Sequence, residues 1–257
     1  MEEQLGGIPT GFYGLDSLIG GFQKKTLAII ASRTSMGKSS LALRMARHIA
    51  TQGTCLFFSS EMTGEQLATK LICGEVGIPS DAVRKGTISP EERVALEKTR
   101  EGFKELPLIF IDRPANIVQL SEDANALRQE WNGLSAVFID PLQGISCGFE
   151  KQITRELKVL AKQLDCPVVV LSQLSPSVDK RNNKRPLNSD LPKEASEEDA
   201  DVVLCVYRDE YYYYRDSEEP NVAELIVTKN RSGETGSVKL EFVNGNFYNP
   251  GESPDRK

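Results

Sequence analysis

The sequence predicts an α/β fold with a mainly parallel central sheet, helices on both faces of the sheet and an antiparallel edge. Three observations favour this class. Between residues 26 and 172, short apolar runs alternate with longer helical patterns, as in repeated βαβ units. The apolar runs are almost unbroken by polar residues, which is typical of strands covered on both faces. After residue 199, further strand-like runs with turn residues between them predict the antiparallel edge.

The first part of the chain carries alternating strands and helices. The strands are rich in Ile, Val, Leu and Phe and are expected at Thr26–Ala31, Thr54–Ser59, Pro107–Asp112, Ser135–Asp140 and Pro167–Ser172. The helices show a helical apolar repeat and are expected at Lys38–Thr51, Gly64–Val76, Pro90–Leu106, Ile117–Trp131 and about Glu150–Leu164. Ser89 before Pro90 is a typical helix start, because serine caps exposed N–H groups and proline fits the first turn.

The character of the chain changes after Ser172. Residues 175–199 lack apolar periodicity and are rich in Pro, Asn and charged residues, which predicts a long functional loop or a mobile segment. Three strands are then expected at Asp201–Tyr207, Ala223–Thr228 and Ser237–Phe242, followed by a polar, frayed tail at residues 249–257. Residues 1–257 are predicted to form a single domain, because one α/β domain often reaches this length.

The composition narrows the class of protein. The chain is 39% hydrophobic and 26% charged, close to globular averages, which argues against disorder and a coiled-coil rod. Its net charge of -6 argues against a protein that coats nucleic acid by overall electrostatic attraction. Any polyanion must therefore bind to a local basic site. The 5 cysteines are scattered and only His48 could join them, so neither a disulfide framework nor a zinc site is expected. A cytoplasmic protein without a membrane partner is expected, since no apolar run could span a bilayer and the amino terminus is acidic.

The strongest motif runs from residue 27 to residue 40, where an apolar strand leads through a loop into a helix. The loop ends in Gly37-Lys38-Ser39, the pattern of a Walker A phosphate-binding loop. Backbone N–H groups wrap a phosphate, the lysine reaches phosphate oxygens and the hydroxyl suits Mg²⁺. Ser32 stands where the first glycine is usual, so a less extreme backbone angle is expected there. The alternative is a chance match on a surface turn. The predicted nucleotide-binding residues are Ser32, Arg33, Thr34, Ser35, Met36, Gly37, Lys38, Ser39 and Ser40.

Three polar residues follow apolar strands, at the edge where open α/β sheets bind ligands. Asp140 ends its strand in the Walker B pattern and is expected to hold Mg²⁺. Glu61 follows the second predicted strand and is a candidate general base for an attacking water. Gln173 is a candidate γ-phosphate sensor. Each also has a plainer interpretation, because acids at strand ends are often helix caps and a glutamine there can be a solvated loop residue.

Nine short segments in a fixed order are more specific together than any one motif. They are Gly11–Asp16, Ser35–Ser39, Ser60–Met62, Ile139–Gln143, Leu171–Leu174, Arg185–Leu191, Asp199–Asp201, Tyr207–Glu210 and Lys229–Arg231. This set resembles the carboxy-terminal motor domain of bacterial replicative DNA helicases of the DnaB type. The resemblance implies a RecA-like P-loop NTPase fold and a homo-oligomeric, hexameric ring that encircles single-stranded DNA and hydrolyses ATP at subunit interfaces. A helicase loader or a primase is a further partner that it suggests.

The resemblance also implies roles for individual residues. Lys38 and Ser39 contact phosphate and Mg²⁺, and Asp140 lies near the metal. Glu61 is the general base and Gln173 senses the γ-phosphate. ATP and Mg²⁺ are therefore the expected ligands of this site.

Lys229 and Arg231 match the family's Lys-x-Arg pair, which reaches into the neighbouring subunit's site. A guanidinium at the γ-phosphate offsets transition-state charge, worth on the order of 10³ to 10⁵ in rate elsewhere. The alternative is a solvated charge pair at a strand end. If the pair acts in trans, activity depends on assembly.

Contacts to DNA are marked less clearly. A basic cluster in the long loop, repeated around a ring, could give a channel a positive lining. The candidate residues are Lys180, Arg181, Lys184, Arg185 and Lys193, and the alternative is a solvated mobile loop. Two stretches depart from the family, because residues 142–157 are shorter than its channel loop and residues 192–195 replace its usual Arg-Glu-Ser-Gly. Tyr211–Tyr214 could stack on a base or on DNA, but packing as edge-strand residues is the favoured interpretation.

Three functions remain open from the sequence. The first is an ATP-driven DNA helicase motor, favoured by the Asn188–Leu191 and Lys229–Arg231 segments. The second is a RecA-like ATPase whose ring does not unwind DNA. The third is a nucleotide-binding assembly module that docks on a helicase or DNA; the altered channel loops favour it, whereas intact Glu61 and Asp140 speak against it.

Overall fold

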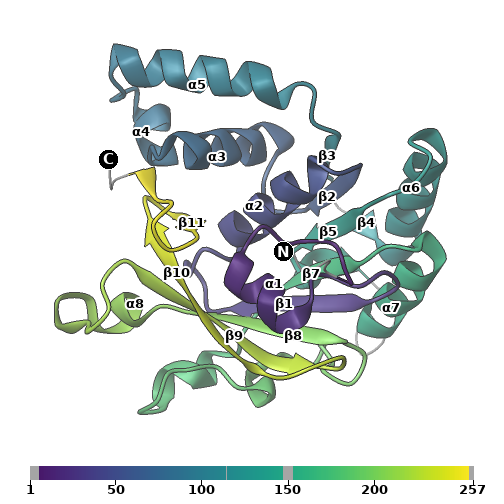
Figure 1. Ribbon diagram of the computed structural model, residues 1–257. Helices are drawn as coiled ribbons and strands as arrows, with labels where there is room; N and C mark the ends of the chain where they lie inside the picture. Colours follow the sequence, from purple (N-terminus) through teal and green to yellow (C-terminus); the bar gives the residue numbers. More distant parts are fainter. Residues whose placement is uncertain (1–5, 114, 147–152, 255–257) are drawn as a thin grey trace.

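The computed structural model describes residues 6–113, 115–146 and 153–254 and contains a 9-stranded sheet in the order β11-β10-β9-β8-β1-β7-β5-β2-β3 (Figure 1). The strands from β8 to β3 run parallel: β8 (Val202–Tyr207), β1 (Leu27–Ser32), β7 (Val168–Gln173), β5 (Ala136–Asp140), β2 (Cys55–Ser59) and β3 (Leu108–Ile111). The edge continues antiparallel through β9 (Val222–Asn230), β10 (Gly236–Val243) and β11 (Asn246–Tyr248). The predicted fold class is confirmed.

Helices cover both faces of the sheet. One face packs against α1 (Tyr13–Ile19), α2 (Lys38–Ala50) and α3 (Gly64–Val76), and the other against α6 (Ile117–Glu130) and α7 (Ile153–Leu164). Strand β1 shows the division, because Ala28 and Ile30 join the first core cluster whereas Leu27 and Ile29 join the second. α4 (Ser80–Lys85) and α5 (Pro90–Phe103) lie outside α3, at the top of Figure 1, and bury no residue fully.

The remaining elements are short. Strands β4 (Ala115–Asn116) and β6 (Ile145–Ser146) form a small parallel pair, and α8 (Asp209–Tyr213) connects β8 to β9. Single 3-10 turns lie at Leu142–Gly144, Pro176–Lys180, Asn188–Asp190 and Tyr214–Asp216. The long loop at residues 175–199 therefore contains two such turns, the first of which begins with the Ser175 hydroxyl accepting from the Ser177 N–H.

Most predicted boundaries agree with the structure to within a few residues, and Gly64–Val76 agrees fully. The start predicted near Glu150 for the last helix lies outside the described residues; the described helix begins at Ile153. The favoured interpretation of the tyrosine run is wrong, because Tyr211–Tyr214 lie in α8 and the turn after it. Asp209 and Glu210 occupy the first turn of α8, where acids favour the positive end of the helix dipole.

The start of the tail also differs from its prediction. Asn249 is 2% exposed; its side chain accepts from the Tyr13 N–H at 3.1 Å and donates to the Gly11 carbonyl at 3.0 Å. Ser253 is buried as well. The tail is therefore anchored at Asn249 and Ser253, and the Asn249 amide satisfies backbone groups just before and at the start of α1.

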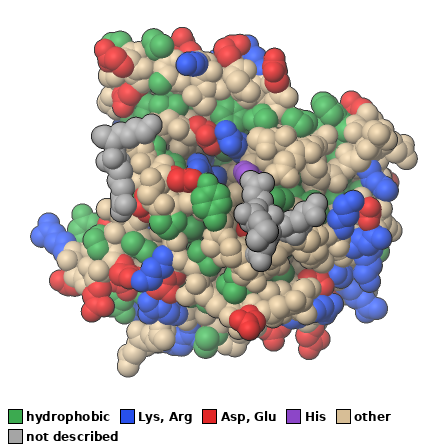
Figure 2. Space-filling view, in the orientation of Figure 1, with side chains coloured by type: hydrophobic (Ala, Val, Ile, Leu, Met, Phe, Trp, Pro, Cys, Tyr) green, Lys and Arg blue, Asp and Glu red, His purple; other side chains and the backbone are tan. Residues whose placement is uncertain are grey.

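Charged side chains of both signs lie interspersed over the face shown in Figure 2, with Lys and Arg most frequent beside α7. Cys55, Cys73, Cys166 and Cys205 are buried free thiols. Burial raises the pKa of the Cys166 thiol to about 12, so it stays protonated at neutral pH. Over residues 6–113, 115–146 and 153–254, no helix combines the length and apolarity that a bilayer crossing requires.

Candidate nucleotide site

The loop between β1 and α2 has the backbone of a phosphate loop. Ser35 and Gly37 have φ angles of 63° and 97°, in the left-handed region, and α2 begins at Lys38. A Cβ on Gly37 would lie 2.8 Å from the Phe247 ring and 2.9 Å from the Phe242 ring, so no side chain fits there. Ser32 ends β1 in an extended conformation, as expected for a loop that lacks the usual first glycine.

A cleft of about 240 Å³ lies at the carboxyl ends of the parallel strands. The register of the sheet makes the strand ends converge, because Ser32 lies opposite Gln173 and Ser59 lies opposite Asp140. The cleft is lined by Ser32, Arg33, Thr34, Ser35, Gly37, Lys38, Ser39, Glu61, Lys70, Pro141, Gln143 and Gln173. The structure thus brings together most of the predicted phosphate-site residues.

Lys38 and Asp140 form an ion pair beside this cleft. Lys38 Nζ lies 3.2 Å from Asp140 Oδ1, and the two side chains are 15% and 2% exposed. A carboxylate this deeply buried is stable as an anion only beside a cation or several donors. The Asp140 carboxylate and the Ser39 hydroxyl are oxygen ligands of the kind that Mg²⁺ prefers, so the two residues fit a metal at the phosphate loop.

Gln173 is bonded to the phosphate loop itself. Its Nε2 donates to Thr34 Oγ1 at 2.7 Å, and its backbone N–H donates to Gln143 Oε1 at 3.4 Å. Gln143 in turn donates from Nε2 to Ser172 Oγ at 3.2 Å. A chain of hydrogen bonds therefore connects the phosphate loop to β7.

Glu61 reaches the cleft from the turn after β2. The turn is fixed at both sides, since the Ser59 hydroxyl accepts from the Met62 N–H at 3.0 Å and the Ser60 N–H donates to the Asp140 carbonyl at 3.1 Å. The carboxylate is exposed and lines the same cleft as Lys38. The Glu61 carboxylate is thus accessible from the cleft, and its role as general base stays a prediction.

Three residues of the predicted phosphate loop make contacts outside the cleft. Met36 is buried in the core, and Ser40 lines a smaller cavity between α2, α3 and β11. The Arg33 guanidinium turns to the long loop, where Nη2 lies 2.8 Å from Asp179 Oδ2 and Nη1 donates to the Leu174 carbonyl at 2.9 Å. The bond from Arg33 lowers the pKa of the Asp179 carboxyl.

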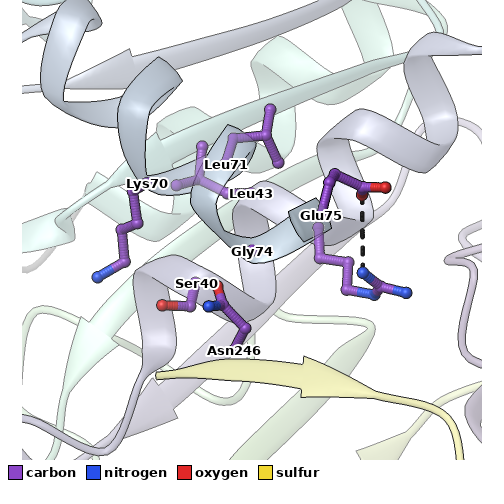
Figure 3. Close-up of a pocket in the computed structure, with 8 residues that line it drawn as sticks. Ser40, Leu43, Lys70, Leu71, Gly74, Glu75 and Asn246 are labelled. Carbon is purple, nitrogen blue, oxygen red and sulfur yellow. Dashed lines mark ion pairs between the residues drawn. The ribbon is translucent and has the colours of Figure 1, made fainter. Parts of the chain in front are cut away.

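Lys70 lines the cleft but was missed by sequence reasoning. It lies on α3 between the cleft and the smaller cavity, and its ammonium extends on the side of the Ser40 hydroxyl, away from Glu75 (Figure 3). Burial lowers the pKa of Lys70, while the charge of Asp140 opposes this shift. No motif marks this residue; the available signal is its place beside Leu71, on the buried side of an amphipathic helix.

Lys229 and Arg231 do not line this chain's cleft within the described residues. Lys229, near the end of β9, donates from Nζ to the Glu197 carbonyl. Arg231 Nη1 lies 3.1 Å from Asp201 Oδ1, and Nη2 donates to the Glu198 carbonyl at 3.2 Å. Their predicted action on a neighbouring subunit stays a prediction.

The predicted DNA-binding residues divide into two groups. Arg181 pairs with Asp190 at 2.9 Å, Arg185 Nε lies 3.0 Å from Glu224 Oε2, and Lys184 donates to the Asp179 and Arg181 carbonyls, both at 2.6 Å. Lys180 and Lys193 are exposed. Intramolecular contacts thus engage the first group, and DNA contact by either group stays a prediction.

A parallel sheet whose central strand, β1, leads into a Gly-Lys-Ser loop, and whose strand β5, two positions along the sheet, ends in an acid, defines a P-loop nucleoside triphosphatase fold. The RadB recombinase has the same RecA-like fold, with a TM-score of 0.58 and 15% sequence identity over 94% of this chain and 99% of that chain. Within this class, the chain belongs to the DnaB-like helicase C terminal domain family, which matches residues 7–248. The resemblance in the sequence is therefore confirmed.

The names of two similar proteins are consistent with this family assignment. The replicative DNA helicase DnaB of Geobacillus stearothermophilus is 38% identical over 94% of this chain and 56% of its own length. The replicative DNA helicase DnaC of Bacillus subtilis is 38% identical over 92% and 55%. The chain thus spans about half the length of these relatives.

A solved structure shows the same similarity in three dimensions. A DnaB-like replicative helicase described with its primase interactions has a TM-score of 0.91 and 30% identity over 96% of this chain and 63% of that chain. The fold therefore agrees with this solved structure over most of the chain.

Proposed function

We propose that this chain is the ATP-hydrolysing motor of a ring-shaped replicative DNA helicase, acting as one domain in the cytoplasm. The observation that carries the proposal is the convergence of Lys38, Ser39, Glu61 and Gln173 on one cleft beside Asp140. Family membership supports the same activity. Because the chain spans about half of its relatives, translocation on single-stranded DNA and duplex unwinding belong to the proposal.

The cleft can perform hydrolysis of a triphosphate. The N–H groups of the phosphate loop and Lys38 bind phosphate oxygens, and Gln173 contacts the loop at the terminal phosphate. Ser39 and Asp140 would hold Mg²⁺, which offsets charge on the phosphates when bound. Glu61 accepts a proton from a water whose oxygen bonds to the γ-phosphorus, while the bond from phosphorus to the β–γ bridging oxygen breaks and ADP keeps the electron pair.

Assembly completes the proposed site. Lys229 and Arg231 lie away from their own cleft, which supports their action on the nucleotide of an adjacent subunit in a hexameric ring. A ring would also place residues 175–199 of every subunit around one DNA strand. A helicase loader and a primase are proposed partners, the latter supported by the primase interactions of a structural neighbour.

A second candidate is a RecA-like ATPase or assembly module that does not unwind DNA. The intramolecular contacts of Arg181, Lys184 and Arg185 favour it, because these contacts leave fewer cations for a DNA backbone.

Turnover of ATP against protein concentration, with and without single-stranded DNA, separates the candidates. For the helicase motor, turnover per subunit rises with concentration, because each site needs a neighbour, and rises further with DNA. The Lys38→Met chain gives the background, since it lacks the phosphate-binding cation. Turnover that is flat with concentration and indifferent to DNA would contradict the proposal.

A further inference from the structure

The carboxylate of Asp201 is a buried junction between three elements. The residue is 6% exposed and stands directly before β8. Its Oδ2 accepts from the Leu27 N–H at 2.8 Å and pairs with Lys158 Nζ of α7. Its Oδ1 lies 3.1 Å from Arg231 Nη1. Because an unpaired buried carboxylate is costly, these donors fix its position.

The backbone around Asp201 holds the basic pair as well. The Arg231 N–H donates to the Asp201 carbonyl at 2.8 Å, and Arg231 Nη2 donates to the Glu198 carbonyl at 3.2 Å. Lys229 Nζ donates to the Glu197 carbonyl. Glu197, Glu198 and Asp201 therefore support these two basic side chains.

Arg231 keeps donors for another molecule in this arrangement. A guanidinium has five N–H groups, and its contacts to Asp201 and Glu198 engage one each on Nη1 and Nη2. The side chain is 54% exposed. The Arg231 guanidinium is thus fixed by two contacts and still has N–H groups that can donate to another molecule.

Lys158 keeps this cluster cationic. An ion pair of Asp201 and Arg231 alone would have no net charge. The ammonium of Lys158 is a second cation, so the three side chains together carry a net charge of +1. Lys158 also donates to the Lys25 carbonyl at 2.9 Å, so a second contact fixes its ammonium group on the Oδ2 side of Asp201. Asp201 can therefore orient the guanidinium without cancelling the attraction of the cluster for a phosphate.

We propose that Asp201 is a positioning residue, which orients Arg231 toward the nucleotide bound by the adjacent subunit. The inference rests on the proposed role of Arg231 in trans. Asp201 also bonds the first residue of β1, whose last residue, Ser32, opens the phosphate loop. The Asp201 carboxylate thus contacts both Arg231, which would act on the adjacent subunit, and β1, the strand that leads into this subunit's own phosphate loop.

The test compares Asp201→Asn with a matched change two residues earlier. Asn at 201 keeps the volume and an acceptor for Leu27 but removes the charge that holds Arg231. We expect kcat to fall about 10- to 100-fold with little change in the KM for ATP, because misorientation affects the transition state. Asp199→Asn is the control, since Asp199 accepts from Thr154 Oγ1 at 2.8 Å, and it should keep wild-type kcat.

A double-mutant cycle distinguishes positioning from a structural effect. In an Arg231→Ala chain, Asp201→Asn should cause no further fall in kcat, because its target is absent. A second fall of the same size would overturn the inference, as would wild-type kcat for Asp201→Asn alone. If Arg231→Ala itself turns over normally, the proposed trans role fails first. Should Asp201→Asn not fold, Asp201→Glu keeps the charge but displaces it, and the same cycle applies.

Discussion

At the scale of single residues, the site depends on buried charges that keep partners. Asp140 is 2% exposed and is paired with Lys38 at 3.2 Å. Under the proposed function, Lys38 turns to phosphate oxygens and Asp140 faces the metal, so neither charge is left uncompensated. Binding of a nucleotide and its metal would therefore exchange one ion pair, between Lys38 and Asp140, for two new ones.

Lys70 should contribute a further cation to phosphate binding. It lines the cleft from α3, and the Lys70→Met change removes the charge while keeping most of the volume. We expect the Kd for ATP to rise about 10-fold or more, since a hydrogen bond to a charged group contributes about 1.5–3 kcal/mol. Lys98→Met on exposed α5 is the control. Equal affinities for both variants would show that Lys70 does not contact phosphate.

His48 should titrate below its ordinary pKa of 6.5. Burial lowers this pKa, and the charges of Arg47 and Arg44 add to the shift, while Asp16 opposes it. The unfolded chain then binds more protons than the folded chain, so stability falls as pH drops through 6.5 and levels off below the folded pKa. Each unit of difference corresponds to about 1.4 kcal/mol.

The imidazole resonances in an NMR titration check this directly, because the chain has 1 histidine. His48→Gln should flatten the stability curve over the same pH range. A titration midpoint at or above 6.5 would contradict the expected shift.

At the scale of elements, the parallel strands could be predicted because each is an unbroken apolar run. Short elements lacked such a signal. β11 has 3 residues, and α1 has 7 and begins without a side-chain cap. The tyrosine run shows the opposite difficulty: its residues favour strands, yet the acids before them and the stacking of Tyr212 on Tyr207 fit a helical turn.

The sequence predicts those site residues that belong to a local motif at the end of an apolar strand. The phosphate loop follows a recognisable strand, and Glu61, Asp140 and Gln173 lie at or just after the ends of β2, β5 and β7. Lys70, Gln143 and Asp201 were not predicted as site residues, because their roles arise from contacts between distant segments. The bond from Leu27 to Asp201 spans 174 residues, which no local pattern reports.

At the scale of the whole molecule, the described subunit holds an incomplete version of the proposed site. The cleft contains Lys38, Glu61 and Gln173, whereas Arg231 lies outside it and is held by Asp201. Under the proposed function, completion by a neighbour would make hydrolysis a property of the ring, and it would tie each subunit's turnover to the position of the next. This dependence is the central claim to test.

Mixing two inactive variants tests it most directly. Glu61→Gln rings lack the proposed general base, and Arg231→Ala rings lack the guanidinium proposed to act in trans. Each variant alone should therefore turn over ATP at a small fraction of the wild-type rate. Subunits exchanged at equal amounts restore a complete site at about a quarter of random interfaces, and turnover should recover to about that fraction. Rings that exchange subunits yet show no recovery would contradict action in trans.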